Sequence, residues 1–196
     1  MIAIIDYCTG NLRSVCNALD RIGADYVLTD DPSVIRQADH VLLPGVGEAS
    51  SAMEKLYQKG LCDVIRSLTM PVLGICIGMQ LMCSRSDEGN VDCLGIFGAD
   101  VRRLKPVPEK GVKVPHMGWN TLSGLESPLF DGISDGDSVY FVHSYAADTC
   151  PETIAVSDNG RRFSAAMNKG NFYGVQFHPE KSGDVGKRIL RNFMKL

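Results

Sequence analysis

The chain has 196 residues, of which 44% are apolar and 22% charged, and its formal net charge is −3. At about 150 residues per domain this length predicts one domain over residues 1–196, large enough to build a core without disulfides or metals. The charge argues against a nucleic-acid-binding protein, which normally carries a basic face. The one basic stretch, residues 102–113, is interrupted by two prolines and a glutamate, so we interpret it as a solvated loop.

The cysteines and the N-terminus predict a cytoplasmic protein. Seven cysteines with no Cys-x-x-Cys pair do not indicate a disulfide framework or a structural zinc site. The first residues lack the basic segment of a signal peptide. Residues 67–84 carry no charge, but Pro71, Gly74, Gly78 and Gln80 interrupt the apolar run. We therefore expect a buried strand, a turn and a helix there, and no membrane span.

Strands and helices alternate in the first half of the chain. The predicted strands are residues 1–6, 26–28, 41–43 and 72–75. The first helix is expected to have Asn11 as its N-cap and to be closed by Gly23, and a short helical segment starts at Asp31. A later helix places Met53, Leu56 and Tyr57 on one face. This alternation predicts an α/β three-layer sandwich, with helices on both faces of a mainly parallel sheet.

The second half is richer in strands and turns. Strands are predicted at residues 96–104, 139–145, 153–158, 162–168 and 172–177. We expect them to be partly antiparallel and to extend the same sheet, which makes the sheet mixed. The chain is predicted to end in a helix capped by Ser182, with one apolar side made by Val185, Ile189, Phe193 and Leu196.

A cysteine stands where a nucleophile elbow is expected. The run Gly74-Ile75-Cys76-Ile77-Gly78 follows an apolar strand and precedes a helix. In such a Gly-x-nucleophile-x-Gly turn the central side chain is exposed at the carboxyl end of the sheet, and the tight turn leaves no room for Cβ atoms at the glycines. The alternative is a buried packing cysteine. The position between strand and helix favours the nucleophile.

A base and an acid follow near the end of the chain. Pro179 disfavours helical backbone at His178, and side chains two apart on extended chain point the same way. His178 and Glu180 are therefore expected to share a face. A carboxylate that orients an imidazole, which deprotonates a thiol, is the arrangement of acyl-transfer enzymes. The alternative is a lone histidine satisfied within the core.

Backbone N–H groups for an oxyanion hole are expected from two loops. Pro44-Gly45-Val46-Gly47 ends a strand at the carboxyl edge of the sheet, where the N–H of Val46 can converge with that of Ile77. A dinucleotide-binding turn is the alternative, but Ser50 stands where a third glycine belongs. No metal site is expected, because no histidine lies at ligand spacing from a cysteine.

These motifs together resemble those of the class I (triad) glutamine amidotransferases, which carry Gly-x-Cys-x-Gly-x-Gln and His-Pro-Glu. Here the runs are Gly74-Ile75-Cys76-Ile77-Gly78-Met79-Gln80 and His178-Pro179-Glu180. Over the whole chain, the resemblance is to the family of glutaminase subunits of imidazole glycerol phosphate synthases. It rests further on Pro44-Gly45-Val46-Gly47, Pro115-His116-Met117-Gly118-Trp119-Asn120, Tyr140-Phe141-Val142-His143-Ser144-Tyr145 and residues 174–182.

The resemblance implies a flavodoxin-like fold and an enzyme that hydrolyses L-glutamine. The ammonia would pass to a (β/α)8-barrel cyclase subunit, which forms imidazole glycerol phosphate and aminoimidazole carboxamide ribotide in histidine biosynthesis. The residues implied to contact glutamine are Gly47, Gln80, Glu88, Ser144 and Tyr145. Those implied to face the cyclase are Met117, Trp119, Asn120, Tyr140 and Lys181. The alternatives are core packing for Trp119 and Met117 and a solvated side chain for Lys181.

Two features of the loops bear on this resemblance. Cys8 stands where many relatives have glycine, outside the triad. Val46 is β-branched and resists unusual backbone angles. We therefore hypothesise that its N–H points away at rest and turns inward when the cyclase binds its ligand. Full glutaminase activity of the isolated subunit would contradict this hypothesis.

The expected reaction is acyl transfer through Cys76, His178 and Glu180, with no metal or organic cofactor. Two rivals are weighed against it. A γ-glutamyl hydrolase on the same fold would not explain the segments 115–120 and 140–145. A non-catalytic binding module would be expected to lose a member of the triad, and all three are present.

Overall fold

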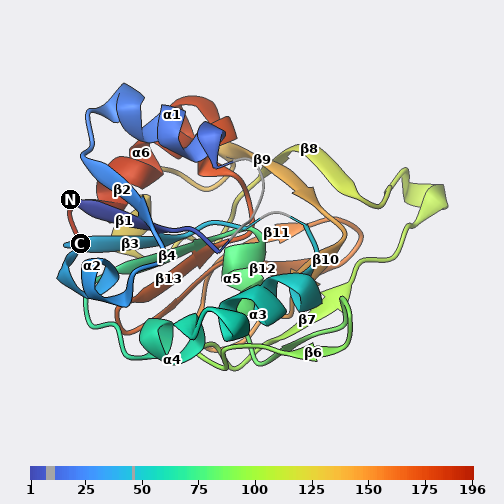
Figure 1. Cartoon of the computed structure of the whole chain (residues 1–196). Coiled ribbons are helices and arrows are strands. Elements are labelled where there is room, and N and C mark those ends of the chain that lie inside the picture. The colour runs from blue at the N-terminus through green and yellow to red at the C-terminus, as the bar shows by residue number, and fades with distance from the viewer. Residues whose placement is uncertain (8–11, 46) are drawn as a thin grey trace.

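The computed structural model describes residues 1–7, 12–45 and 47–196, and a seven-stranded sheet runs through its centre (Figure 1). The strands of this sheet are β1 (Ile2–Ile5), β2 (Tyr26–Thr29), β3 (His40–Leu43), β4 (Val72–Ile75), β11 (Thr153–Asp158), β12 (Arg162–Lys169) and β13 (Phe172–Val175). Their order is β11-β12-β13-β4-β3-β1-β2. β2, β1, β3, β4 and β13 are parallel, whereas β12 and β11 are antiparallel to their neighbours. The predicted fold class is confirmed.

Helices cover both faces of the sheet and give three layers (Figure 1). On one face lie α1 (Arg13–Ile22) and α6 (Gly183–Phe193). On the other face lie α2 (Pro32–Gln37), α3 (Ala49–Gln58), α4 (Leu61–Arg66) and α5 (Ile77–Leu81). α1 is closed by Gly23, as predicted, and this glycine is in left-handed conformation. The predicted N-cap, Asn11, lies outside the described residues, as does Cys8. In the described ranges no helix combines the length and the apolar run that a membrane crossing needs.

The core lies between the central strands and the helices. β1 and β4 are buried along their whole length, as expected for central parallel strands covered on both faces. In α3 the buried stripe runs through Ala49, Ala52, Met53 and Leu56. Tyr57 lies beside this stripe and is 79% exposed, so it does not share the burial of Met53 and Leu56, with which it was grouped.

The second half extends the main sheet only in part. β7 (Asp100–Arg103) and β10 (Tyr145–Ala147) belong to a separate sheet of order β10-β7-β5-β6, completed by β5 (Arg85–Ser86) and β6 (Val91–Asp92). β8 (His116–Thr121) and β9 (Ser138–His143) form a two-stranded ribbon. The predicted strand 139–145 is therefore two strands, because the chain leaves one sheet and enters another at Ser144. The predicted strand 96–104 is reduced to β7.

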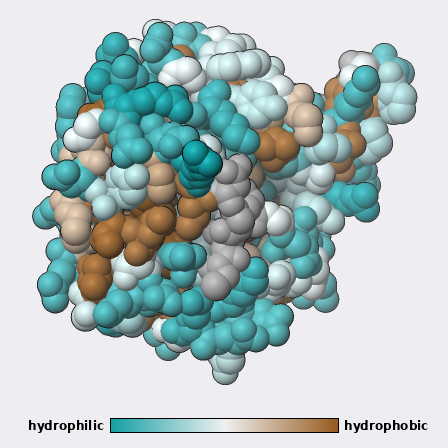
Figure 2. Space-filling model, turned by 45° about the horizontal axis from the view of Figure 1, so that its top comes forward, coloured by the Kyte–Doolittle hydropathy of each residue, from teal (hydrophilic) through white to brown (hydrophobic). Residues whose placement is uncertain are grey.

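The basic stretch divides into strand and arm. Arg102 and Arg103 lie in β7, so the interpretation of the whole stretch as a loop is wrong for them. The rest forms an arm that contains the 3-10 helix η1 (Pro108–Lys110) and is closed by a bridge between Val107 and Val112. Figure 2 shows this arm standing clear of the body and carrying hydrophobic as well as hydrophilic residues.

Ser182 precedes α6 as predicted, but its hydroxyl does not cap the helix. It donates to the carbonyl oxygen of His178 at 2.6 Å and accepts from the N–H of Tyr140 at 2.9 Å. Ile189 and Phe193 are buried, whereas Leu196 lies beyond the end of α6 and is exposed. The hydroxyl thus ties β9 to the start of the His-Pro-Glu turn.

Candidate active site

Cys76 occupies a strained turn between β4 and α5. Its φ of 54° and ψ of −110° lie where L-residues are rarely found, as at the elbow of nucleophile-bearing turns. A Cβ at Gly74 would lie 2.7 Å from the backbone of Gly78, and one at Gly78 would lie 1.8 Å from the carbonyl oxygen of Leu43. The glycines therefore let α5 pack directly on β3 and β4, and this packing holds the elbow.

The loop after β3 approaches the elbow equally closely. A Cβ at Gly45 would lie 2.7 Å from both the Gly78 nitrogen and the Ile77 Cβ. The Tyr7 hydroxyl, 2.9 Å from the same point, donates to the carbonyl oxygen of Pro44 at 2.8 Å. Burial and the nearby Cys76 raise the pKa of Tyr7. Val46 lies outside the described residues, so the orientation of its N–H stays a prediction.

His178 and Glu180 form a buried pair. Nδ1 of His178 lies 2.8 Å from Oε1 of Glu180, and their side chains are 5% and 4% exposed. His178 is extended as expected, but Glu180 lies in the 3-10 helix η3 (Pro179–Lys181). The strand alternation proposed to bring them together is therefore wrong, and a tight turn does so instead. Gly186 allows this turn, since a Cβ there would lie 1.9 Å from the carbonyl oxygen of Pro179.

The electrostatics of this pair favour a protonated imidazole. Burial lowers the pKa of His178, but its interactions with Cys76 and Glu180 outweigh burial and raise that pKa to about 10. Nε2 of His178, on the side of the ring away from Glu180, is buried and makes no hydrogen bond with the described residues. His178 can therefore hold a proton close to Cys76 at neutral pH.

A cavity of about 310 Å³ brings the predicted residues together. Its lining includes the predicted residues Gly47, Cys76, Ile77, Gln80, Glu88, Ser144, Tyr145, His178 and Lys181. Pro115, Val142 and His143 also line it, without having been predicted to do so. Lys181 was expected at the partner face and contributes to this cavity as well. In the described part of the chain, no cluster of three or more His, Cys, Asp or Glu side chains could hold a metal ion.

Polar groups from several elements converge on this cavity. Nε2 of Gln80 donates to the carbonyl oxygen of Tyr145 and to Oε1 of Gln176, both at 2.9 Å, whereas Oε1 of Gln80 is buried without a partner among the described residues. Glu88 accepts from the N–H of Ala49 at 3.0 Å. Burial raises the pKa of Glu88.

Sequence reasoning missed Gln176. Its Nε2 donates to Sγ of Cys76 at 3.6 Å, and its side chain is fully buried. Gln176 directly follows β13, two residues before His178. The period-two alternation of a strand could have pointed to it, because His178 was already a candidate.

The sequence model of the family glutamine amidotransferase class-I matches residues 3–196 of this chain. The chain belongs to this family. It is 54% identical to the imidazole glycerol phosphate synthase subunit HisH of Bacteroides fragilis, with 100% of this chain and 99% of that protein covered. The subunit HisH 2 of Legionella pneumophila strain Paris is 49% identical, with 100% and 98% covered.

Solved structures agree on the fold. A structure described as a glutamine amidotransferase superposes with a TM-score of 0.75 at 17% identity and covers 100% of this chain and 98% of that one. A glutamine amidotransferase from Thermotoga maritima gives 0.65 at 19% identity, with 99% and 82% covered. The amidotransferase described here is thus an enzyme of the class I family, with the fold of these structures.

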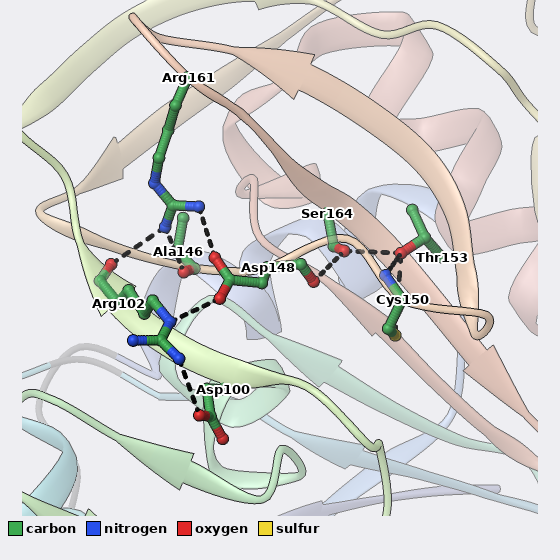
Figure 3. A network of polar contacts seen from close by, with 8 residues as sticks. All are labelled: Asp100, Arg102, Ala146, Asp148, Cys150, Thr153, Arg161 and Ser164. Atoms are coloured by element: carbon green, nitrogen blue, oxygen red, sulfur yellow. Dashed lines mark hydrogen bonds and ion pairs between the residues drawn. The ribbon is translucent and has the colours of Figure 1, made fainter.

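Backbone and side-chain hydrogen bonds together hold the wall of the amidotransferase cavity that β9 and β10 form. The N–H of Leu104 donates to the carbonyl oxygen of Ser144 at 2.8 Å. Beyond β10, Asp148 accepts from Arg102 at 2.6 Å and from Arg161 at 2.7 Å (Figure 3). Arg161 also donates to the carbonyl oxygen of Ala146 at 2.9 Å. Figure 3 shows both guanidinium groups turned toward one carboxylate, which joins β7, β10 and the turn before β12.

The ribbon β8–β9 carries the residues predicted to face a partner, except Lys181, which lies in η3. Met117 and Trp119 are 63% and 58% exposed, so the alternative of core packing is wrong for both. Trp119 packs edge-to-face on Tyr140, with ring centroids 6.0 Å apart. Asn120 differs, because its amide points inward and donates to the carbonyl oxygen of Asp158 at 2.7 Å.

Proposed function

We propose that this amidotransferase is the glutaminase subunit of an imidazole glycerol phosphate synthase. It would hydrolyse L-glutamine and deliver ammonia to a cyclase subunit. Full-length relatives about half identical to this chain bear that subunit's name. The observation that carries the chemistry is that Cys76 and His178 line one cavity, while the buried Glu180 is bonded to Nδ1 of His178.

The first half of the reaction forms a thioester. The sulfur of Cys76, whose proton is held by His178, attacks the side-chain carbonyl carbon of glutamine and gives a tetrahedral intermediate. His178 then gives its proton to the amide nitrogen as the C–N bond breaks, and ammonia leaves. Glu180 keeps Nδ1 of the imidazole bonded, so that Nε2 is the nitrogen that moves the proton.

The second half releases glutamate. A water molecule attacks the thioester carbonyl while His178 accepts one of its protons, and the C–S bond breaks. The N–H of Ile77, in the first turn of α5, is proposed to stabilise the oxyanion in both halves, together with that of Val46. No metal or organic cofactor takes part in this scheme.

The polar lining suits an amino-acid substrate. We propose that the carboxylate of Glu88 and the free Oε1 of Gln80 accept hydrogen bonds from the α-ammonium group of glutamine. Gly47, with a φ of 103°, together with Ser144 and Tyr145, would complete the site.

The partner is proposed to be a (β/α)8-barrel cyclase that docks on the outer side of β8. Aromatic and methionine side chains are enriched in protein interfaces, which favours the exposed Met117 and Trp119, and the half-buried Tyr140 beside them, as contacts. Lys181 and Asn120 are proposed to lie at the border of this surface. We expect both subunits in the cytoplasm, and direct docking would keep ammonia from being protonated in bulk water.

Two measurements test this function. Glutamine hydrolysis is measured for the chain alone and after mixing with the cyclase subunit, and hydrolysis in the mixture is expected. The complex is also treated with a glutamine-analogue alkylator and digested for peptide mapping. We expect label on Cys76 alone, and label on another cysteine or on none would overturn the assignment.

A further inference from the structure

Hydrogen bonds leave the inner side of β8 toward the glutamine cavity. Nδ2 of Asn120 lies 3.2 Å from Nε2 of His116. Nδ1 of His116 lies 3.0 Å from Nε2 of His143, its antiparallel neighbour on β9. Nδ1 of His143 lies 2.8 Å from the carbonyl oxygen of Tyr145. Three side chains thus link the ribbon to a residue that lines the cavity.

The chemistry of these groups allows one direction for every hydrogen bond. The carbonyl oxygen of Tyr145 can only accept, so Nδ1 of His143 donates and Nε2 of the neutral ring accepts. His116 must then donate from Nδ1, which leaves its Nε2 to accept from the amide of Asn120. Both histidines therefore carry their single proton on Nδ1.

The amide of Asn120 is fixed from both sides. Its Oδ1 accepts from the N–H of Thr121 at 2.8 Å, and its Nδ2 donates to the carbonyl oxygen of Asp158 at 2.7 Å. After a 180° rotation of the amide, Nδ2 would face the N–H of Thr121, donor against donor. Oδ1 would face the carbonyl oxygen of Asp158, acceptor against acceptor. The amide of Asn120 and the carbonyl of Tyr145 therefore fix the same proton positions from the two ends of this chain of contacts.

The same chain of contacts continues to the nucleophile. The carbonyl oxygen of Tyr145 also accepts from Gln80, whose amide donates in turn to Oε1 of Gln176. Nε2 of Gln176 donates to Sγ of Cys76 at 3.6 Å. An unbroken series of hydrogen bonds thus runs from β8 to the sulfur atom.

The surroundings of the two histidines keep them neutral. The ring of His116 stacks on Phe141 with centroids 4.8 Å apart, and Phe163 packs edge-on against His143 at 5.2 Å. Burial is the main cause that lowers the pKa of His143 to about 3, and it also lowers the pKa of His116. The hydrogen bond to Tyr145 opposes the shift of His143. Three titratable or charged neighbours also lower the pKa of His143: His116, His178 and Arg161.

We propose that Asn120, His116 and His143 are positioning residues. A partner bound to the outer side of β8, where Met117 and Trp119 are exposed, acts on Cys76 through them. The exposed Met117 and Trp119 alternate on β8 with the inward His116 and Asn120, so any displacement of the strand moves both sets. This inference rests on the proposed function, since it needs a partner at β8 and glutamine at Cys76.

Nuclear magnetic resonance tests the proton positions directly. The chain has four histidines, and long-range ¹H–¹⁵N spectra of histidine-labelled protein separate Nδ1-protonated from Nε2-protonated rings. We expect His116 and His143 to be neutral with the proton on Nδ1. In Asn120→Asp the carboxylate can only accept, while Nδ1 of His116 must still donate to His143, so His116 is expected to gain a second proton on Nε2. The matched control is Asn159→Asp, which alters an exposed amide and should leave both rings unchanged.

Kinetics test the link to the nucleophile. With the cyclase subunit at saturation, we expect Asn120→Asp to lower kcat/KM for glutamine about tenfold or more, mainly through kcat. His116→Phe keeps an aromatic ring but removes both hydrogen bonds, and should lower kcat/KM for glutamine by a similar factor. His116→Asn keeps an N–H near the position of Nδ1 and should recover to within about threefold of the native rate.

The outcomes distinguish a failure of the positioning role from a failure of the proposed function. Native rates in Asn120→Asp and His116→Phe, or equal losses in His116→Phe and His116→Asn, would overturn the positioning role. Histidines protonated on Nε2 in the native chain would overturn it without any kinetic measurement, whichever variants fold. A native complex that hydrolyses no glutamine would instead overturn the proposed function.

Discussion

Two walls of one cavity are built in different ways. The elbow wall, from β4 to α5, is held by backbone contact: glycines at 74 and 78 allow approaches that any Cβ would prevent. The opposite wall, where β9 turns into β10, is held by hydrogen bonds, several of which come from side chains. Gln80 and His143 bind the carbonyl of Tyr145, and Ser182 binds the N–H of Tyr140.

The difference teaches which wall can adjust. Close-packed backbone has few alternative arrangements, because a shift of one element collides with the next. A wall held by hydrogen bonds can exchange partners at an energy of about 1 kcal/mol per bond. We therefore expect the elbow to be the fixed reference of the site and the β9–β10 wall to be the part that a partner can move.

The largest expected effect tests the chemistry of the elbow. Cys76→Ser should lower glutamine turnover about 10⁴-fold or more, since replacing a nucleophile removes the covalent route. The unfolding midpoint should change little, because the two side chains are similar in size. Cys62→Ser, in α4 and away from the cavity, is the matched control and should keep native turnover. Comparable losses in both variants would remove Cys76 from its role.

Glu180→Gln should lower kcat by roughly 10² to 10⁴, because an amide cannot stabilise the imidazolium. It also changes the pH dependence of stability. A pKa of His178 raised from 6.5 to about 10 contributes stability that is fully present below pH 6.5 and is lost as pH rises toward 10. Between pH 6.5 and pH 10 the free energy of unfolding should therefore fall less in Glu180→Gln than in the native protein. Denaturant unfolding of both proteins across it gives the comparison, and parallel curves would contradict the assigned ion pair.

Gly78→Ala tests whether backbone contact holds the elbow. The new Cβ would lie 1.8 Å from the carbonyl oxygen of Leu43, so the strand and helix must separate. We expect a loss of about 3 kcal/mol or more in the free energy of unfolding. Gly170→Ala has open space and a φ of +58°, so it should cost about 1 kcal/mol through backbone strain alone. Equal losses would mean that the elbow has room to adjust.

The two walls also differ in how well sequence predicts them. The elbow and the His178–Glu180 pair are local features, with every member within a few positions, so spacing alone indicated them. The β9–β10 wall depends on contacts between distant positions. His116 and His143 are 27 residues apart, and Cys76 and Gln176 are 100 apart. The contact of Asn120 with the carbonyl oxygen of Asp158 joins positions 38 apart, which no local pattern specifies.

The same reasoning explains the errors in the fold. The alternation of strands and helices predicted the parallel sheet, because each strand there is buried on both faces and reads as an apolar run. The second sheet was missed because its strands are short and its pairing joins β7 to β10 across the chain. Ser144, where β9 ends and β10 begins, has no turn residue beside it to mark the break.

Ser182→Ala should give the smallest effect, and it tests the side-chain hydrogen bonds of the β9–β10 wall. Its hydroxyl bonds both the N–H of Tyr140 and the carbonyl oxygen of His178, so truncation strands a backbone donor. We expect unfolding to become easier by about 1–3 kcal/mol, with kcat lowered only a few-fold because the His178–Glu180 bond remains. Ser67→Ala removes one hydroxyl bond, to Val64, and should cost less. If Ser182→Ala cost no more than this control, the side-chain bonds of Ser182 would contribute little to holding this wall.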